Sequence, residues 1–544
     1  MPSLLVVASL LAALSVALAV LVALAERRYR AIRLEIVERE DEDAALTAPE
    51  RASPIAELVG RLAEEARAEA RSSGHRLLPD GPQALGVRLA LIAAAARTLD
   101  LQYYTWADDL AGRVLARAAL DAADRGVRVR VIVDDLHARG ARDLIETLAA
   151  HPLITVRVFN PALTRRAWLA HWIVDFRRMN RRMHNKALVA DGAAAITGGR
   201  NVADSYYGLS SIMNFRDLDV LAVGPAAGAL EASVDRYWNG EFAFPAAAFG
   251  IEERADPNVV AERRTGLDRR IAEAVSATAE QARAGAQTTP TLATALSGFV
   301  WCPSHLLDDP PDAPRVGADR VARHLARDLD AAHERIEIEA AYFVPGREGV
   351  GRFASLTERG VAIAALTNSF ATNDVLAAQA GYAKYRPTLL RAGLELYEFK
   401  PDAPVRTLGS LLGGSLTGSR PGRGKVAGLH TKALLIDGRR SYVGSFNLDP
   451  RSARDNSEVM LAVEGEAFAE RLGAVLAEGR SPDVSYKVTL ATDGGTRNVL
   501  EGSTHRSRER WHEGSRIRTD EPSLTRPAAL LAAFVQRLPI ERLL

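Results

Sequence analysis

The sequence predicts an α/β protein with two similar α/β/α domains packed about a pseudo-twofold axis, preceded by one N-terminal transmembrane helix. Three observations lead to this fold class: an eight-residue motif occurs twice, helix and strand patterns alternate along the chain, and the N-terminus is apolar. A chain of 544 residues is long enough to bury two such cores.

The apolar segment runs from Ser3 to Ala25 without a charge, and about 20 apolar residues in a helix span a bilayer. Arg27, Arg28, Arg30 and Arg33 follow directly, whereas no basic residue precedes the segment. This asymmetry predicts a single-pass anchor with the rest of the chain in the cytoplasm, which in a bacterial protein would place it in the inner (cytoplasmic) membrane. A cleaved signal peptide is the alternative, although its usual cationic start is missing; it would make a periplasmic location possible.

Helix and strand patterns also repeat. Arg125-Gly126-Val127 precedes the β-branched stretch 128–133, and Arg359-Gly360-Val361 precedes the similar stretch 362–366, so both sites predict a helix followed by a strand. We expect an anchor (1–30), a linker (31–75), a first domain (76–250), a connecting segment (251–295), a second domain (296–485) and a C-terminal extension (486–544). The boundary between the two domains is expected between Pro245 and Pro290.

The duplicated motif reads His-Asn-Lys-Ala-Leu-Val-Ala-Asp from His184 to Asp191 and His-Thr-Lys-Ala-Leu-Leu-Ile-Asp from His430 to Asp437. The Asp-Gly pair that ends each copy is a typical hairpin turn, after which an apolar run returns as a second strand. Each return strand ends in a glycine turn that carries Asn201 or Asn447. Alternation along a strand places His184 with Lys186, and His430 with Lys432, on one face.

These residue types suit phosphoryl transfer, which needs a nucleophile, a proton donor for the leaving oxygen, and cations for the phosphoryl oxygens. Two imidazoles, with pKa values near ~6.5, can share the first two tasks at neutral pH. One histidine on a half-buried strand is usually structural. Two complete copies with matching asparagines instead favour one active site built from both halves, in which an imidazole attacks a phosphodiester.

The paired motifs resemble those of the phospholipase D superfamily, and the similarity extends along nearly the whole chain after the N-terminal segment. Several further stretches resemble the bacterial cardiolipin synthase branch, and within it the C type. These stretches are Leu99–Tyr104, Asn180–Lys186, Phe215–Leu221, Ala341–Gly346, Leu366–Ser369 and Leu538–Leu544.

The resemblance implies two phospholipase D-like domains and a phosphohistidine intermediate. It favours His184 as the nucleophile and His430 as the general acid and base, although the near symmetry of the two copies leaves this assignment open. Lys186, Lys432 and the two asparagines would bind the phosphoryl oxygens in place of a metal. No cofactor is expected, and neither the single Cys302 nor the scattered histidines have the spacing of metal ligands.

In this superfamily a carboxylate often orients each histidine by accepting its other ring proton. Glu458 lies 28 residues after His430, just before a strand, and Asp217 lies 33 residues after His184 at the matching place. This difference in spacing leaves Asp219 as an alternative to Asp217, and both candidates could also be solvated residues at strand starts. Asp191 and Asp437 are expected to fix the hairpin turns rather than to meet substrate.

Some segments fit contact with lipid. Trp168, Trp172 and Phe176 alternate with arginines in the stretch 165–182, and the C-terminal stretch 530–544 has an apolar stripe; both also fit ordinary packing. The Gly-rich loop around residues 420–424 is either a lid over phosphate or an insertion without a ligand. The net charge of +1 shows no basic bias, so a nucleic-acid partner is not expected.

We therefore expect a membrane-anchored phosphatidyltransferase that makes cardiolipin from phosphatidylglycerol and a phosphatidyl donor, either phosphatidylglycerol or phosphatidylethanolamine. A phospholipase D that releases phosphatidic acid, or a nuclease of the same superfamily, is the alternative. A lipid-binding scaffold with a dead site is disfavoured because both motifs are complete. The partners are membrane phospholipids and the bilayer, and the resemblance allows a small accessory protein.

Overall fold

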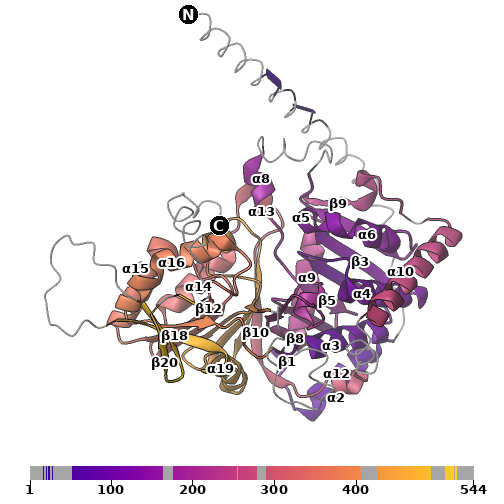
Figure 1. The fold of residues 1–544 in the computed structure, drawn as a ribbon. Helices are drawn as coiled ribbons and strands as arrows, with labels where there is room; N and C mark the ends of the chain where they lie inside the picture. Colours follow the sequence, from indigo (N-terminus) through magenta and orange to yellow (C-terminus); the bar gives the residue numbers. More distant parts are fainter. Residues whose placement is uncertain are drawn as a thin grey trace, which may run out of the picture.

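A computed structural model of the chain describes residues 52–162, 175–253, 255–277, 290–405, 426–491, 509–519 and 521–522, together with positions 16, 17, 20, 23, 24 and 27 (Figure 1). None of the helices in this described part combines the length and the apolar character needed to cross a bilayer. Most of the expected anchor lies outside the described residues. So do Trp168, Trp172, the Gly-rich loop at 420–424 and the C-terminal stretch 530–544.

The strands of the first half form one continuous sheet. In chain order they are β1 (Ser72–Leu78), β2 (Thr98–Tyr103), β3 (Arg128–Asp134), β4 (Ile154–Phe159), β5 (Ala187–Ala190), β6 (Ala194–Gly198), β8 (Asp219–Val223) and β9 (Ala243–Pro245). Across the sheet the order is β1-β8-β6-β5-β2-β3-β4-β9, and only the β2-β3 and β3-β4 contacts are parallel.

The second half repeats this order strand for strand. Its strands are β10 (Val300–Asp308), β11 (Arg335–Ala340), β12 (Ala362–Asn368), β13 (Glu395–Phe399), β15 (Lys432–Ile436), β16 (Arg440–Gly444), β17 (Val459–Glu464) and β18 (Ser485–Leu490). They run β10-β17-β16-β15-β11-β12-β13-β18, with parallel contacts again only at β11-β12 and β12-β13. Antiparallel pairing of β1 with β10 joins the halves. A pseudo-twofold relation between the halves requires this repeated order.

Helices cover both faces of each sheet (Figure 1). In the first half, Leu188 and Ala190 pack with α3 (Gly81–Ala94), α4 (Leu110–Asp124) and α6 (Arg142–Ala149). The alternate residues Ala187 and Val189 pack with α9 (Pro225–Trp238) on the opposite face. Because successive side chains of a strand point to opposite faces, this alternation requires the three-layer arrangement.

The second half is layered in the same way. Leu434 and Ile436 pack with α14 (Arg320–Asp330), α15 (Gly346–Glu358) and α16 (Leu376–Arg391). Ala433 and Leu435 pack with α19 (Glu466–Gly479) on the other face. The mixed α/β class expected from the sequence is therefore confirmed, and both predicted helix-to-strand steps are present as α4 to β3 and α15 to β12.

The remaining helices and 3₁₀ turns of the described residues pack around these layers. They are α2 (Pro54–Glu65), α5 (Asp135–Ala138), α8 (Phe176–Asn180), α10 (Pro257–Ala277), α12 (Leu292–Ala295), α13 (Ala313–Val316) and α18 (Pro450–Arg454), with 3₁₀ turns η1 (Arg139–Ala141), η3 (Asp204–Tyr206) and η4 (Ala246–Phe249). Helix α10, in the connecting segment, lies against the first half, where Arg264 pairs with Asp121 at 2.5 Å and Arg117 pairs with Asp268 at 2.6 Å.

The sheets extend beyond the domain limits expected from the sequence. Strand β1 begins before residue 76, and β18 crosses the expected limit at 485 to pair with β13. The hairpin of β19 (Glu509–Glu513) and β20 (Arg516–Arg518) then adds to β18. These strands are short and rich in charged residues, so their sequence lacks the apolar alternation that marks a buried strand.

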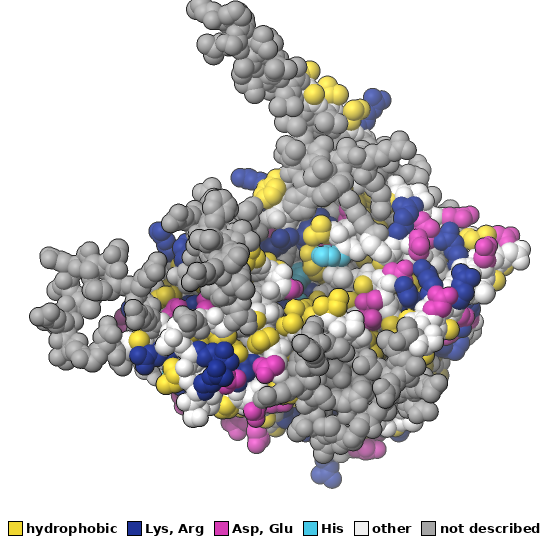
Figure 2. All heavy atoms as spheres, viewed as in Figure 1, with side chains coloured by type: hydrophobic (Ala, Val, Ile, Leu, Met, Phe, Trp, Pro, Cys, Tyr) yellow, Lys and Arg dark blue, Asp and Glu magenta, His cyan; other side chains and the backbone are white. Residues whose placement is uncertain are grey.

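A small second sheet links the two halves. Strand β7 (Met213–Arg216) of the first half pairs in parallel with β14 (Val426–Leu429) of the second half. Nearby, Val220 of β8 and Leu218, just before that strand, share a core with Leu461 and Val463 of β17. On the described part of the face seen in Figure 2, basic and acidic side chains are interspersed, as the balanced composition suggests.

The two motif aspartates occupy the hairpin turns. Asp191 and Asp437 adopt left-handed backbone angles, with φ of 53° and 51°. The Asp437 carboxylate accepts hydrogen bonds from the backbone N–H groups of residues 333, 334 and 335, at 3.0, 2.8 and 2.9 Å. Asp191 does the same for residues 96, 97 and 98. Each aspartate therefore fastens its hairpin to the start of the neighbouring strand.

We expect Asp437→Ala to lower the free energy of unfolding by about 1–3 kcal/mol, because three backbone donors lose a charged acceptor. Asp437→Asn should cost less, since asparagine tolerates the left-handed conformation and keeps one acceptor oxygen. Chemical denaturation of the purified protein measures the difference. Glu273→Ala on the exposed face of α10 serves as the control and should change stability by less than about 0.5 kcal/mol. Equal effects for all three variants would contradict this role of Asp437.

Candidate active site

The two motif histidines meet at the seam between the halves. Both precede the motif strands rather than lying within them: His184 comes before β5, and His430 comes between β14 and β15. The backbone N–H of His184 donates to the carbonyl of Ser457 at 2.9 Å, and the N–H of His430 donates to the carbonyl of Arg216 at 2.8 Å. Each histidine is thus held by backbone of the other half.

A carboxylate from the opposite half contacts each imidazole. Nδ1 of His184 lies 2.9 Å from Oε2 of Glu458, and Nδ1 of His430 lies 2.7 Å from Oδ2 of Asp217. The exchange follows from the backbone pairing, since Glu458 comes directly after Ser457 and Asp217 directly after Arg216. A carboxylate that accepts the Nδ1 proton leaves Nε2 of the neutral ring as the reactive nitrogen. Ser445, in the second glycine turn, donates its hydroxyl proton to Glu458.

Asp219, two residues after Asp217, contacts neither motif histidine. Its carboxylate pairs with the Arg88 guanidinium at 2.9 Å and accepts the backbone N–H of Arg200 at 3.1 Å. All three side chains are buried. Of the two alternatives that the sequence left open, Asp217 is therefore the one beside a motif histidine, and Asp219 anchors α3 and the first glycine turn to β8.

The two motif lysines lie beside the histidines and are also buried. Nζ of Lys432 is 2.8 Å from Nδ1 of His430, and Nζ of Lys186 donates to the backbone carbonyl of His184 at 2.5 Å. Nζ of Lys186 also lies 5.5 Å from the centre of the Tyr104 ring. The arrangement brings four cationic or potentially cationic groups to one place, which suits the binding of an anion.

Burial controls the protonation of this cluster. It lowers the pKa of Lys186 to about 7 and that of Lys432 to about 8, because a buried ammonium loses its hydration. Burial also lowers the pKa of both histidines; the lysine charges act in the same direction. Burial raises the pKa of Glu458 to about 8. The site without an anion thus favours neutral imidazoles, as a nucleophile requires.

The two asparagines differ in their surroundings. Asn201 uses its amide group within the protein, since Oδ1 accepts the backbone N–H of Thr105 at 3.2 Å and Nδ2 donates to the Tyr206 hydroxyl at 3.0 Å. Asn447 is buried as well, but its Oδ1 has no hydrogen-bond partner among the described residues. The matching positions in the two motifs are therefore not equivalent in their contacts.

Aromatic side chains that the motifs did not indicate enclose both imidazoles. Tyr104 meets His184 edge to face, with ring centres 5.1 Å apart, and Tyr206 meets His430 in the same way at 4.9 Å. Phe215 lies 5.3 Å from His430. The Tyr206 hydroxyl is 3.5 Å from Nε2 of His430. Tyr104 falls in a stretch that supported the family resemblance, whereas Tyr206 follows the first motif without a counterpart after the second.

Known proteins resemble this chain over much of its length. The family model described as "Cardiolipin synthase, PLD-like domain" matches residues 89–224 and 325–478. Cardiolipin synthase C of Escherichia coli K12 is 37% identical over 395 residues, covering 71% of this chain and 80% of that protein. Cardiolipin synthase A of Pseudomonas entomophila L48 is 24% identical over 402 residues, covering 74% of this chain and 67% of that protein.

The chain also matches solved structures. Phosphatidylserine synthase of Haemophilus influenzae Rd KW20 aligns with 79% of this chain and 92% of that chain, at 14% identity and a TM-score of 0.49. On the family match and the 37% identity, the chain belongs to the phospholipase D superfamily. Within that superfamily it falls in the cardiolipin synthase branch, as its sequence predicts, and it is an enzyme of the phosphatidyltransferase type.

Binding of an anion should be coupled to proton uptake. The lowered lysine pKa values mean that positive charge is lost as the pH rises through 7 to 8, and a bound anion restores it. We expect uptake of roughly one proton or more per ion at pH 8 when tungstate, an analogue of phosphate, binds. Below pH 6 the lysines are already charged, so their share of the uptake should be small. Titration calorimetry in buffers of different ionisation enthalpy measures this number.

Lys186→Met should reduce the proton uptake, whereas Lys487→Met, on the exposed part of β18, should leave it unchanged. An observed enthalpy that is the same in every buffer at pH 8 would show that the lysines are already charged in the free enzyme.

Proposed function

We propose that this enzyme makes cardiolipin, by transferring a phosphatidyl group from phosphatidylglycerol or phosphatidylethanolamine to a second phosphatidylglycerol. The observation that carries the proposal is the pair of exchanged contacts, His184 with Glu458 and His430 with Asp217, with a buried lysine beside each histidine. The likeness to a protein named cardiolipin synthase C supports the choice of substrates.

In the first step, Nε2 of His184 attacks phosphorus of the donor lipid. A P–N bond forms and the bond to the headgroup oxygen breaks, and the departing glycerol or ethanolamine takes a proton from Nε2 of His430. Burial raises the pKa of Glu458 to about 8, and the positive charge that grows on the His184 ring favours its ionised form, which holds the Nδ1 proton in place. Family resemblance favours these roles for the two histidines, and the near symmetry of the two motifs leaves the reverse assignment open.

His430 must carry a proton before this step, although burial and Lys432 lower its pKa in the free site. The contact with Asp217 acts in the opposite direction, and the negative charge of an incoming phosphodiester adds to it. Substrate binding thus prepares the acid. Lys186 and Lys432 would neutralise the phosphoryl oxygens, and they too become more strongly protonated once the anion is present.

In the second step, the free hydroxyl of phosphatidylglycerol attacks phosphorus from the side that the headgroup left. His430, now neutral, accepts the hydroxyl proton, while the P–N bond breaks and returns neutral His184. The product is cardiolipin, and water in place of the lipid alcohol would give phosphatidic acid.

We further propose a single-pass anchor over residues 3–25 with the catalytic part in the cytoplasm, supported by the arginines that follow this segment. The proposal includes no accessory protein.

The direct test uses the full-length protein in detergent with isotope-labelled phosphatidylglycerol, with and without phosphatidylethanolamine. We expect labelled cardiolipin by mass spectrometry, and a decrease of roughly 10⁴-fold or more in His184→Ala. A gain in yield with phosphatidylethanolamine would identify it as a donor. Phosphatidic acid as the sole product would instead make the protein a hydrolase, and the absence of any lipid product would overturn the proposal.

Each orienting carboxylate should affect kcat more than KM, because it acts on the imidazole and not on the lipid. We expect Glu458→Gln and Asp217→Asn each to lower kcat by about 10²–10⁴-fold. Asp217→Asn should also lower the apparent pKa of the acid step, since His430 loses the anion that favours its protonated form. Steady-state kinetics from pH 5 to 9 measures both quantities. If kcat and the pH profile of both variants match the wild type, the exchanged pairs have no catalytic role.

A further inference from the structure

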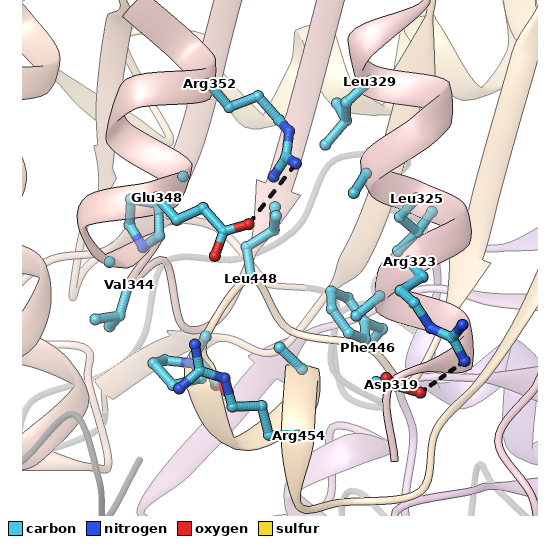
Figure 3. Close-up of a pocket in the computed structure, with 18 of the residues that line it drawn as sticks. Asp319, Arg323, Leu325, Leu329, Val344, Glu348, Arg352, Phe446, Leu448 and Arg454 are labelled. Carbon is cyan, nitrogen blue, oxygen red and sulfur yellow. Dashed lines mark hydrogen bonds and ion pairs between the residues drawn. The ribbon is translucent and has the colours of Figure 1, made fainter.

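A pocket separate from the histidine site lies in the second half, between α14, α15 and α18 (Figure 3). Its volume is about 630 Å³, within the range of roughly 300–1,000 Å³ that is usual for sites of small ligands. None of the residues assigned above to the chemistry lines it. Apolar side chains make up its walls, among them Leu325, Leu329, Val344, Phe446 and Leu448.

Charged side chains surround this apolar interior. Arg323 pairs with Asp319 at 2.9 Å, and Arg352 pairs with Asp330 at 2.8 Å. The side chains of Arg347 and Arg454 are exposed and have no ion-pair or hydrogen-bond partner among the described residues. In Figure 3, Arg454 extends from α18 across one end of the pocket. Glu348, which lies 4.0 Å from Arg352, and Asp449 also line the pocket. An apolar chamber bordered by two arginines without a direct partner is complementary to an amphiphile with an anionic head.

The same end of the pocket adjoins apolar side chains that face solvent. The backbone carbonyl of Arg454 accepts the N–H of Ala318 at 3.0 Å, just after α13. At the end of α13, Val316 is 58% exposed, and Phe176 of the adjacent α8 is 41% exposed. The two helices come from different halves and are joined by a hydrogen bond from Arg181 to the carbonyl of Arg315. Exposed apolar groups beside arginines are typical of a surface that meets lipid headgroups.

The pocket also touches the second glycine turn. Phe446 and Leu448 flank Asn447, and Leu448 forms a bridge with Phe343 while its carbonyl accepts the N–H of Val344 at 2.7 Å. The wall of the pocket is therefore the backbone that carries Asn447. A molecule in the pocket would be held close to the proposed catalytic centre without entering it.

We propose that this pocket binds one acyl chain of an anionic phospholipid, with its phosphate on Arg454 and Arg347. The lipid would not react, so the inference goes beyond the proposed function and does not depend on the reaction itself. Its role is to hold the second half against the bilayer, next to the place where α8 and α13 meet the headgroups. A free phosphate would bind the arginines without contacting the apolar walls. A neutral lipid would fill the apolar interior without pairing with the arginines.

The test is photolabelling of the full-length protein in phosphatidylcholine vesicles that contain phosphatidylglycerol with a diazirine on one acyl chain. His184→Ala is used alongside the wild type, so that turnover of the probe does not affect the result. We expect label on peptides from α14, α15 and α18. Unlabelled phosphatidylglycerol should compete about tenfold better than added phosphatidylcholine, as one charge-assisted contact predicts. Inorganic phosphate should not compete.

Two variants of the pocket and two control variants give the inference a sharper test. Arg454→Glu should weaken labelling of the pocket about tenfold, and Ala322→Trp should block it by filling the chamber. Arg454→Lys should keep most of the labelling, and Arg269→Glu, an exposed site on α10, should keep all of it. Thermal unfolding verifies that each variant is folded.

Absence of label from the pocket would overturn the inference, as would equal competition by both lipids for the pocket label or indifference of that label to Arg454→Glu. Formation of cardiolipin is assayed separately in the wild type. Labelled pocket without cardiolipin would defeat only the proposed function, and cardiolipin without labelled pocket would defeat only the lipid site.

Discussion

The site depends on two backbone hydrogen bonds that cross the seam between the halves, from His184 to the carbonyl of Ser457 and from His430 to that of Arg216. Each bond fixes the register of one histidine against the other half. Because the carboxylates come one residue later, in Glu458 and Asp217, this register alone brings each of them to an imidazole. The parallel pairing of β7 with β14, and the bridge between Met183 and Ser457, are the two copies of this connection.

Burial gives the assembled cluster its chemical character. Desolvation makes ammonium and imidazolium ions costly here, so the histidines favour their neutral forms and the lysines lose their protons close to neutral pH unless an anion is bound. The carboxylates of Glu458 and Asp217 and the hydroxyl of Ser445 already occupy fixed positions. Such a site needs little movement of its side chains during a reaction, because they are held in position beforehand.

Local signals in the sequence predicted much of this structure. The Asp-Gly turns, the alternating apolar residues and the helix-to-strand steps depend on near neighbours, and the observed hairpins and layers match them. The exchange of carboxylates depends on contacts between residues more than 200 positions apart, such as Asp217 and His430, and no local pattern specifies such pairing. Tyr206 belongs to the first half alone, so the repeat gave no indication of it. The charged strands of the β19-β20 hairpin lack the periodicity of a buried strand.

Because each histidine pairs with a carboxylate of the other half, the site depends on how the two halves are aligned. A shift of one half against the other by a fraction of a hydrogen-bond length would separate both histidines from their carboxylates at the same moment, since both pairs cross the same seam. Neither half alone contains a complete pair of histidine and carboxylate. The two sheets could keep their internal strand pairing throughout such a slip. Chemical competence is therefore a property of the alignment of the two halves rather than of either fold.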